Sequence, residues 1–203
     1  ITALFGSNSK EILVLHSYND GLKWSDGITS GIKEIIEKYP NLELTIEYMD
    51  SKKIDNQEYF DTLINLYEKK FSNRKYDVII SVDNYAYEFV LKNHKKLFNS
   101  SALVFCGVEN FDEKQIPKEL KSEVTGVIEY KELKKNIELI KDVIKELNIL
   151  YIISDDSFSS LAIKEQILND SKEFEKDVKI IFDNQIDINT ISEKINNLDK
   201  NSA

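Results

Sequence analysis

Side chains able to do chemistry recur at one kind of position in this sequence, namely where an apolar run stops. The first such run, residues 12–15, is followed within ten positions by His16, Ser17, Tyr18 and Trp24. Imidazole, hydroxyl and aromatic groups of this kind can hold a small polar molecule that has an apolar or cationic part. The ends of the apolar runs are therefore the places where we look for function.

Carboxylates, an amide and a glycine follow the later apolar runs in the same way. These residues are Asp50, Asp83, Asn84, Gly107, Glu109, Asn110, Asp155, Asp156 and Ser157. A structural interpretation stands beside the functional one for several of them. Asp83 and Asn84 occupy positions typical of helix caps, and so do Asp155 and Ser157. Trp24 is in phase with the apolar side of the segment that follows it, so it also fits a core position.

Signatures of catalysis and of metal or cofactor binding are missing from the sequence. There is no GxGxxG, no GxxxxGK[ST] and no GxSxG pattern. His16 and Ser17 are neighbours on a predicted strand and so point to opposite faces, which prevents a base–nucleophile pair. Two histidines and one cysteine exclude a multi-histidine or cysteine-rich metal centre. We expect no cofactor, Cys106 packed as a small apolar residue, and His94 on the surface among lysines.

The elements that must position these residues alternate between strands and helices along the whole chain. Apolar runs predict strands over residues 12–15, 42–50, 76–83, 102–108, 124–130, 149–154 and 178–182. Segments with apolar residues at helical spacing lie between most of them. This alternation predicts an α/β protein with doubly wound, mainly parallel sheets. Ligands of such sheets bind outside the carboxyl ends of the strands, which is where the polar residues fall.

The pattern also predicts how the chain is divided. Residues 1–9 begin with an apolar stretch and read as a leader, either the tail of a removed signal or anchor or a disordered segment. Residues 10–128 supply five strands and form a first α/β lobe. Residues 129–203 supply two strands and form a partial second α/β lobe. Because a two-stranded parallel sheet has a bare edge, we expect further strands or a partner chain, as in a homodimer, to cover it.

Composition narrows the class of partner. Hydrophobic residues make up 41% of the chain and charged residues 31%, which suits a packed core. The net charge of −9 argues against a nucleic-acid surface, which needs a clustered basic footprint. No apolar run is long enough to span a bilayer, so we expect a membrane connection only through segments outside this chain.

Four stretches resemble a known family. VLHSYNDGLKWSDGITSGI, YDVIISVDNYAYEFVL, LVFCGVENF and VTGVIE look like the ABC-transporter substrate-binding-protein-like family, over about residues 10 to 182. This family has the type 1 periplasmic-binding-protein fold, with two α/β lobes, a hinge and a ligand in the cleft between them. The variant with these segments is similar to the extracytoplasmic sensor domains of bacterial histidine kinases and diguanylate cyclases. The sequence departs from the family at its end, because the family's second lobe continues with more strands.

The resemblance implies a set of ligand-binding residues. The first lobe would line the cleft with Ser17, Tyr18, Trp24, Asp83, Asn84, Gly107 and Val108, and the second lobe with Asp155 and Ser157. It implies a non-enzymatic, membrane-anchored extracytoplasmic sensor domain for a small molecule, such as an amino acid or a similar small polar metabolite. One alternative is a solute-binding protein of an ABC importer. A further alternative is a small α/β enzyme that uses Asp83 or Cys106.

Overall fold

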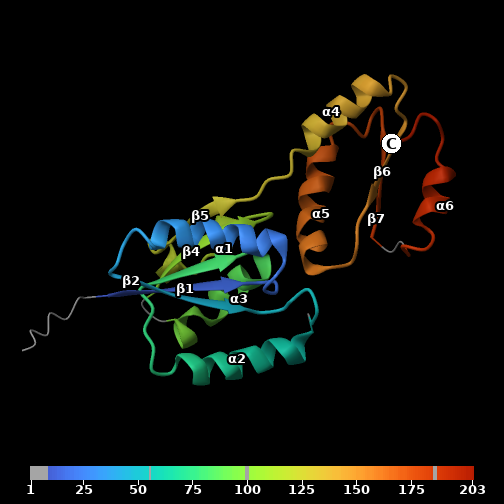
Figure 1. Ribbon diagram of the computed structural model, residues 1–203. Coiled ribbons are helices and arrows are strands. Elements are labelled where there is room, and N and C mark those ends of the chain that lie inside the picture. Colours follow the sequence, from blue (N-terminus) through green and yellow to red (C-terminus); the bar gives the residue numbers. More distant parts are fainter. Residues whose placement is uncertain (1–8, 55, 99–100, 185–186) are drawn as a thin grey trace, which may run out of the picture. The chain divides into compact units, whose positions relative to one another are not determined.

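The computed structural model describes residues 9–54, 56–98, 101–184 and 187–203 (Figure 1). Its chain divides into two units, Ile1–Glu129 and Tyr130–Ala203. Residues 1–8 of the predicted leader lie outside the described residues.

A five-stranded parallel sheet forms the centre of the first unit, with the order β2-β1-β3-β4-β5. Its strands are β1 Lys10–His16, β2 Leu42–Tyr48, β3 Val78–Val82, β4 Ala102–Val108 and β5 Val124–Ile128. The inner strands are buried because helices cover both faces, which explains their unbroken apolar sequences. The predicted doubly wound, mainly parallel α/β fold is therefore confirmed, and β2 is an edge strand as its alternating sequence indicated.

Three helices cover this sheet, one on one face and two on the other (Figure 1). They are α1 Lys23–Ile36, α2 Gln57–Phe71 and α3 Asn84–Leu97, and the short 3-10 turns η1 Glu113–Gln115 and η2 Lys118–Leu120 lie between β4 and β5. Aromatic side chains join α2 to α3, where the Tyr67 and Phe89 rings meet edge to face at 5.6 Å. Asn56 starts α2 and Asp83 starts α3 by accepting hydrogen bonds from backbone N–H groups.

The second unit has its own sheet and its own core. Its elements are α4 Leu133–Val143, β6 Ile149–Ile153, α5 Phe158–Ser171, β7 Lys179–Asp183 and α6 Ile191–Asn196. Strands β6 and β7 are parallel, and Ile137, Leu150 and Val178 are among the buried residues of its core. All the residues of this core belong to the second unit.

The chain's last described residues pair with strand β6 of the second unit. The backbone N–H of Tyr151 donates to the carbonyl of Ala203, and Ile149 and Ser202 form a parallel bridge. One edge of β6 is therefore paired in part, because a short segment after α6 returns along the sheet. The coverage of this sheet by further strands or by a partner chain stays a prediction.

Candidate functional site

The carboxyl ends of β1, β2, β3 and β4 lie level with one another. His16 is in register with Tyr48 of β2 and with Val82 of β3, and Val82 is in register with Cys106 of β4. The four loops that follow these strands therefore leave the sheet at one edge, as parallel topology requires. The predicted residues of the first lobe all lie at this edge, which we call the carboxyl edge.

A buried hydrogen bond joins the loops after β1 and β3. The Tyr18 hydroxyl donates to Oδ2 of Asp83 over 2.6 Å. Oδ1 of the same carboxylate accepts from the backbone N–H of Tyr85 over 3.4 Å, which makes Asp83 the N-cap of α3. Burial raises the pKa of the Asp83 carboxyl, and the hydrogen bond from Tyr18 acts in the opposite direction. Asp83 thus has the capping role that the sequence suggested, and it also holds the loop after β1. Its role in ligand binding stays a prediction.

Trp24 is a large aromatic side chain that remains accessible at the carboxyl edge. It lies in the first turn of α1, its ring is 5.6 Å from that of Tyr18, and 37% of it is exposed. A Cβ placed on Gly107 would come within 2.9 Å of Cζ2 of Trp24, and Gly107 has φ +67°. Only glycine therefore permits both this backbone conformation and the close approach of the indole. The core position that the helical phase allowed for Trp24 is not what the structure shows.

Lys52 is a residue of this edge that sequence reasoning missed. Its ammonium lies 4.4 Å from the centroid of the Tyr18 ring, a cation–π distance. The signal was available in the sequence, because Lys52 follows the strand-end residue Asp50 by two positions. Lysines are common in surface loops, however, so its type alone did not separate it from its neighbour Lys53. Lys53 instead forms an ion pair with Asp50.

Three other predicted residues are engaged within the protein. The Ser17 hydroxyl donates to the carbonyl of Val82 and accepts from the backbone N–H of Ala86, each over 2.8 Å. The Asn84 side chain bonds both the N–H and the carbonyl of Glu109, each over 2.9 Å. Val108 is buried. These side chains fix the loops after β1, β3 and β4, and so they shape the carboxyl edge.

Asp155 and Ser157 close the second unit's strand β6 in the manner of a helix cap. The Ser157 hydroxyl accepts from the backbone N–H of Ser160 at the start of α5. Oδ1 of Asp155 accepts from the backbone N–H of Ser157 over 3.1 Å. This is the capping arrangement that the sequence allowed for the pair, and a role in ligand binding stays a prediction.

His16 lies beneath the carboxyl edge and is fully buried. Its Nε2 is 2.8 Å from the Thr29 hydroxyl of α1, and its ring stacks on that of Tyr48 at 5.0 Å. Burial lowers the pKa of His16 to about 4, while the charges of Asp26 and Asp20 act in the opposite direction. His16 is therefore neutral near pH 7. Its ring contacts α1 whereas the hydroxyl of Ser17 contacts α3, which confirms that the two side chains point to opposite faces.

The thiol of Cys106 and the possible metal ligands bear on the enzyme alternative. Burial raises the pKa of the Cys106 thiol to about 11, and the Asp83 charge acts in the same direction, so the thiol is protonated at neutral pH. Over residues 9–54, 56–98, 101–184 and 187–203, no three His, Cys, Asp or Glu side chains are grouped to hold a metal ion.

Across the same residues, no helix combines the length and apolar character needed to cross a membrane.

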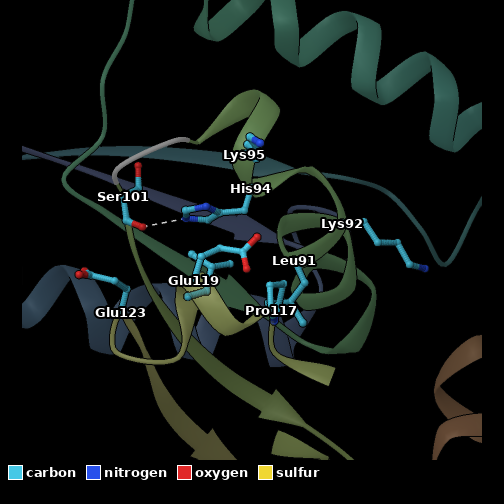
Figure 2. Close-up of a pocket in the computed structure, with 9 residues that line it drawn as sticks. Leu91, Lys92, His94, Lys95, Ser101, Pro117, Glu119 and Glu123 are labelled. Atoms are coloured by element: carbon cyan, nitrogen blue, oxygen red, sulfur yellow. Dashed lines mark hydrogen bonds between the residues drawn. The ribbon is translucent and has the colours of Figure 1, made fainter. Parts of the chain in front are cut away.

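A hollow of about 760 Å³ lies at the opposite, amino edge of the sheet (Figure 2). His94 of α3 forms part of its wall, and its Nε2–H donates to the carbonyl of Ser101 over 2.8 Å. The prediction that His94 lies on the surface is wrong, because the residue is buried. Its lysine neighbours were misleading, since His94 follows the buried Val90 by four positions and so shares the inner face of α3.

No family model and no curated protein matches the chain. A conserved domain protein from Vibrio cholerae matches its structure with a TM-score of 0.64 and 13% identity, over 91% of this chain and 60% of that one. An ABC domain from Streptococcus pneumoniae in complex with L-Trp matches with a TM-score of 0.63 and 17% identity, again over 91% and 60%.

A third solved structure is that of a ligand-free, open substrate-binding protein with adhesive properties from Clostridium difficile. It matches with a TM-score of 0.56 and 13% identity, over 92% of this chain and 61% of that one. The chain thus has the fold of the periplasmic solute-binding proteins of ABC transporters, type 1, as the sequence resemblance implied. It spans about 60% of the length of these three proteins.

Proposed function

We propose that this chain is the extracytoplasmic, small-molecule-binding sensor domain of a membrane-bound bacterial signalling protein of the histidine kinase or diguanylate cyclase type. The observation that carries the binding role is the partly exposed indole of Trp24, which lies against Gly107 at the carboxyl edge beside the Tyr18–Asp83 pair. The fold supports the same role, because it is the fold of solute-binding proteins.

The chemistry of the carboxyl edge suits an amino acid or a similar small polar metabolite. An indole face provides contact area for an apolar group with little conformational entropy to lose. Asp83 and Lys52 approach Tyr18 from different loops and carry opposite charges. A zwitterion would place its ammonium toward Asp83 and its carboxylate toward Lys52, with its side chain on Trp24. Among the solved structures of this fold, one holds L-Trp and another holds 3,4-dihydroxybenzoic acid.

The test begins with a thermal-shift screen of metabolites on the full-length protein, followed by calorimetry on any compound found. Trp24→Ala is expected to weaken binding of that compound by about 1–3 kcal/mol, the order of an aromatic stacking contact. Tyr39→Ala is the matched control, because Tyr39 is also an exposed aromatic residue, at 53%, and follows the other end of α1. Equal affinity of the parent and Trp24→Ala for the compound would place binding elsewhere.

A solute-binding protein of an ABC importer is the second candidate, and the names of the structural neighbours favour it. The two candidates differ in what the protein does after binding. The encoded sequence beyond residue 203 separates them, because a sensor continues into a transmembrane helix and a kinase or cyclase. A ligand-dependent change in kinase or cyclase output supports the first candidate, whereas ligand uptake through a permease supports the second. A homodimer stays a prediction for either one.

A further inference from the structure

We infer that His16 is a positioning residue of the carboxyl edge, which through Thr29 holds helix α1 and thereby keeps Trp24 against Gly107 only while the imidazole is uncharged. This inference rests on the proposed function for its biological meaning, since Trp24 is the residue proposed to bind ligand. The inference adds regulation by pH to that site, because Trp24 would lose its position against Gly107 in acid.

The first support is the way in which His16 joins three elements. It is the last residue of β1, its ring stacks on Tyr48 at the end of β2, and its Nε2 bonds Thr29 in the middle of α1. Trp24 lies five residues before Thr29 on the same helix. Because α1 is a continuous helix from Lys23 to Ile36, a displacement at Thr29 is passed on to Trp24.

The second support is that only one of the two nitrogens of the imidazole has a hydrogen-bond partner among the described residues. Its Nδ1 is buried and has no hydrogen-bond partner among the described residues. A neutral imidazole tolerates this arrangement at modest cost, whereas an imidazolium has two N–H donors and a charge, and both must be satisfied. Protonation therefore favours any displacement of α1 that brings water to the ring.

The charged and titratable groups around the ring do not hold it in its protonated form at neutral pH. Asp26 on α1 and Asp20 in the loop before it act on His16 by charge, and the Tyr48 phenol faces it from β2. Neither carboxylate has a hydrogen bond to the ring, so they favour the imidazolium only through space. Burial outweighs them and lowers the pKa of His16 to about 4. The change is therefore expected in mildly to moderately acid solution.

The experiment uses Trp24, which is the only tryptophan of the chain, as the reporter. Acrylamide quenching of its fluorescence is followed from pH 7.5 downward, with far-UV circular dichroism to show that the chain stays folded. We expect quenching by acrylamide to rise at least twofold with a midpoint near pH 4. His16→Gln keeps a polar group that reaches Thr29 but does not titrate in this range, so its transition is expected to disappear.

Two further variants keep the test decisive. His94→Gln is the matched control, because it removes the chain's other buried histidine, which lies at the amino edge. It should retain the acid transition. Thr29→Val removes the hydroxyl but keeps the shape, and it should raise quenching at pH 7.5 toward the parent's acid value, even if His16→Gln does not fold.

An acid transition that persists in His16→Gln, or that disappears in His94→Gln, overturns the inference. So does a parent without a transition, or a Thr29→Val variant quenched like the parent at pH 7.5. Because none of these measurements uses a ligand, their failure leaves the proposed function open to its own test. In the same way, a failure of Trp24→Ala to weaken binding leaves the role of His16 in positioning α1 intact.

Discussion

Asp83, at the carboxyl edge, combines a strained backbone conformation with a buried carboxylate. Its φ of 74° lies in the left-handed region, its side chain is buried, and its carboxylate holds both Tyr18 and the start of α3. Asp and Asn tolerate this backbone conformation better than other non-glycine residues, because their short polar side chains bond locally. The residue type is therefore explained by the backbone and the cap, while the burial of its charge is a cost.

That cost gives a pH-dependent prediction. The folded state raises the pKa of Asp83, so the native state binds more protons than the unfolded state between pH 3.8 and the raised value. The free energy of unfolding from this group falls as pH rises through that window and is constant above it. Asp83→Asn removes the effect but keeps an acceptor for Tyr18. Urea unfolding of both proteins should show the parent losing stability relative to Asp83→Asn from pH 4 to pH 7.

Asp83→Ala serves as the comparison for this experiment. It lacks both the cap and the tolerance for positive φ, and we expect it to lose about 2 kcal/mol of stability at either pH. A stability difference between the parent and Asp83→Asn that does not change with pH would contradict the prediction.

At the scale of elements, two glycines of the first unit have opposite surroundings. A Cβ added at Gly31, on α1, would meet no atom within 4 Å. A Cβ added at Gly126, on β5, would come within 2.3 Å of the Phe105 carbonyl oxygen and 2.4 Å of its ring. No steric contact requires a glycine at position 31, where it only makes α1 more flexible. At position 126 the absence of a side chain lets the ring of Phe105 lie over the edge strand.

A matched pair of substitutions follows. Gly31→Ala should raise the free energy of unfolding by about 0.5–1 kcal/mol, because glycine is a poor helix former. Gly126→Ala should lower it by about 1–3 kcal/mol, the usual cost of overpacking. Chemical denaturation of the two variants and the parent is the measurement. Equal stability of all three proteins would show that neither position matters in the way its surroundings indicate.

The elements were more predictable from sequence than the contacts of the site. Buried strands and amphipathic helices have opposite periodicities, so β1, α1 and their successors follow from apolar spacing. The parallel order then brings the polar strand ends to one edge. What spacing does not encode is side-chain direction in irregular segments. The bond from Tyr18 to Asp83 and the stacking of Lys52 on Tyr18 depend on loop conformation. The burial of His94, by contrast, agrees with its helical spacing from Val90 and was hidden only by the lysines beside it.

At the scale of the whole molecule, two cores are joined by one connection. The first unit ends at Glu129 and the second begins at Tyr130, whose side chain is 54% exposed. Each unit has its own sheet, so cleavage between them would leave both sheets intact. Exposed connections between cores are preferred sites of proteolysis.

Limited chymotrypsin digestion should therefore cut first after Tyr130. Mass spectrometry should find a fragment that ends there and resists further digestion, because its strands β1, β3 and β4 are buried. Tyr130→Ser is the control and should slow this cut without changing the others. Early cleavage within β1 to β4 would mean that the first unit is less stable than its core indicates.

The order of strands in the first unit also has a consequence for how quickly it can fold. β1 lies between β2, which follows it directly, and β3, which comes much later in the chain. Lys10 and Asp77, which pair at the start of these strands, are 67 residues apart. Closing such a loop has an entropic cost that precedes any gain from pairing, so folding on the slower, millisecond-to-second side is expected. Until Val78–Val82 pair with it, β1, the strand with the most buried residues in the native sheet, has one open edge. This is the interval in which the chain is most exposed to aggregation.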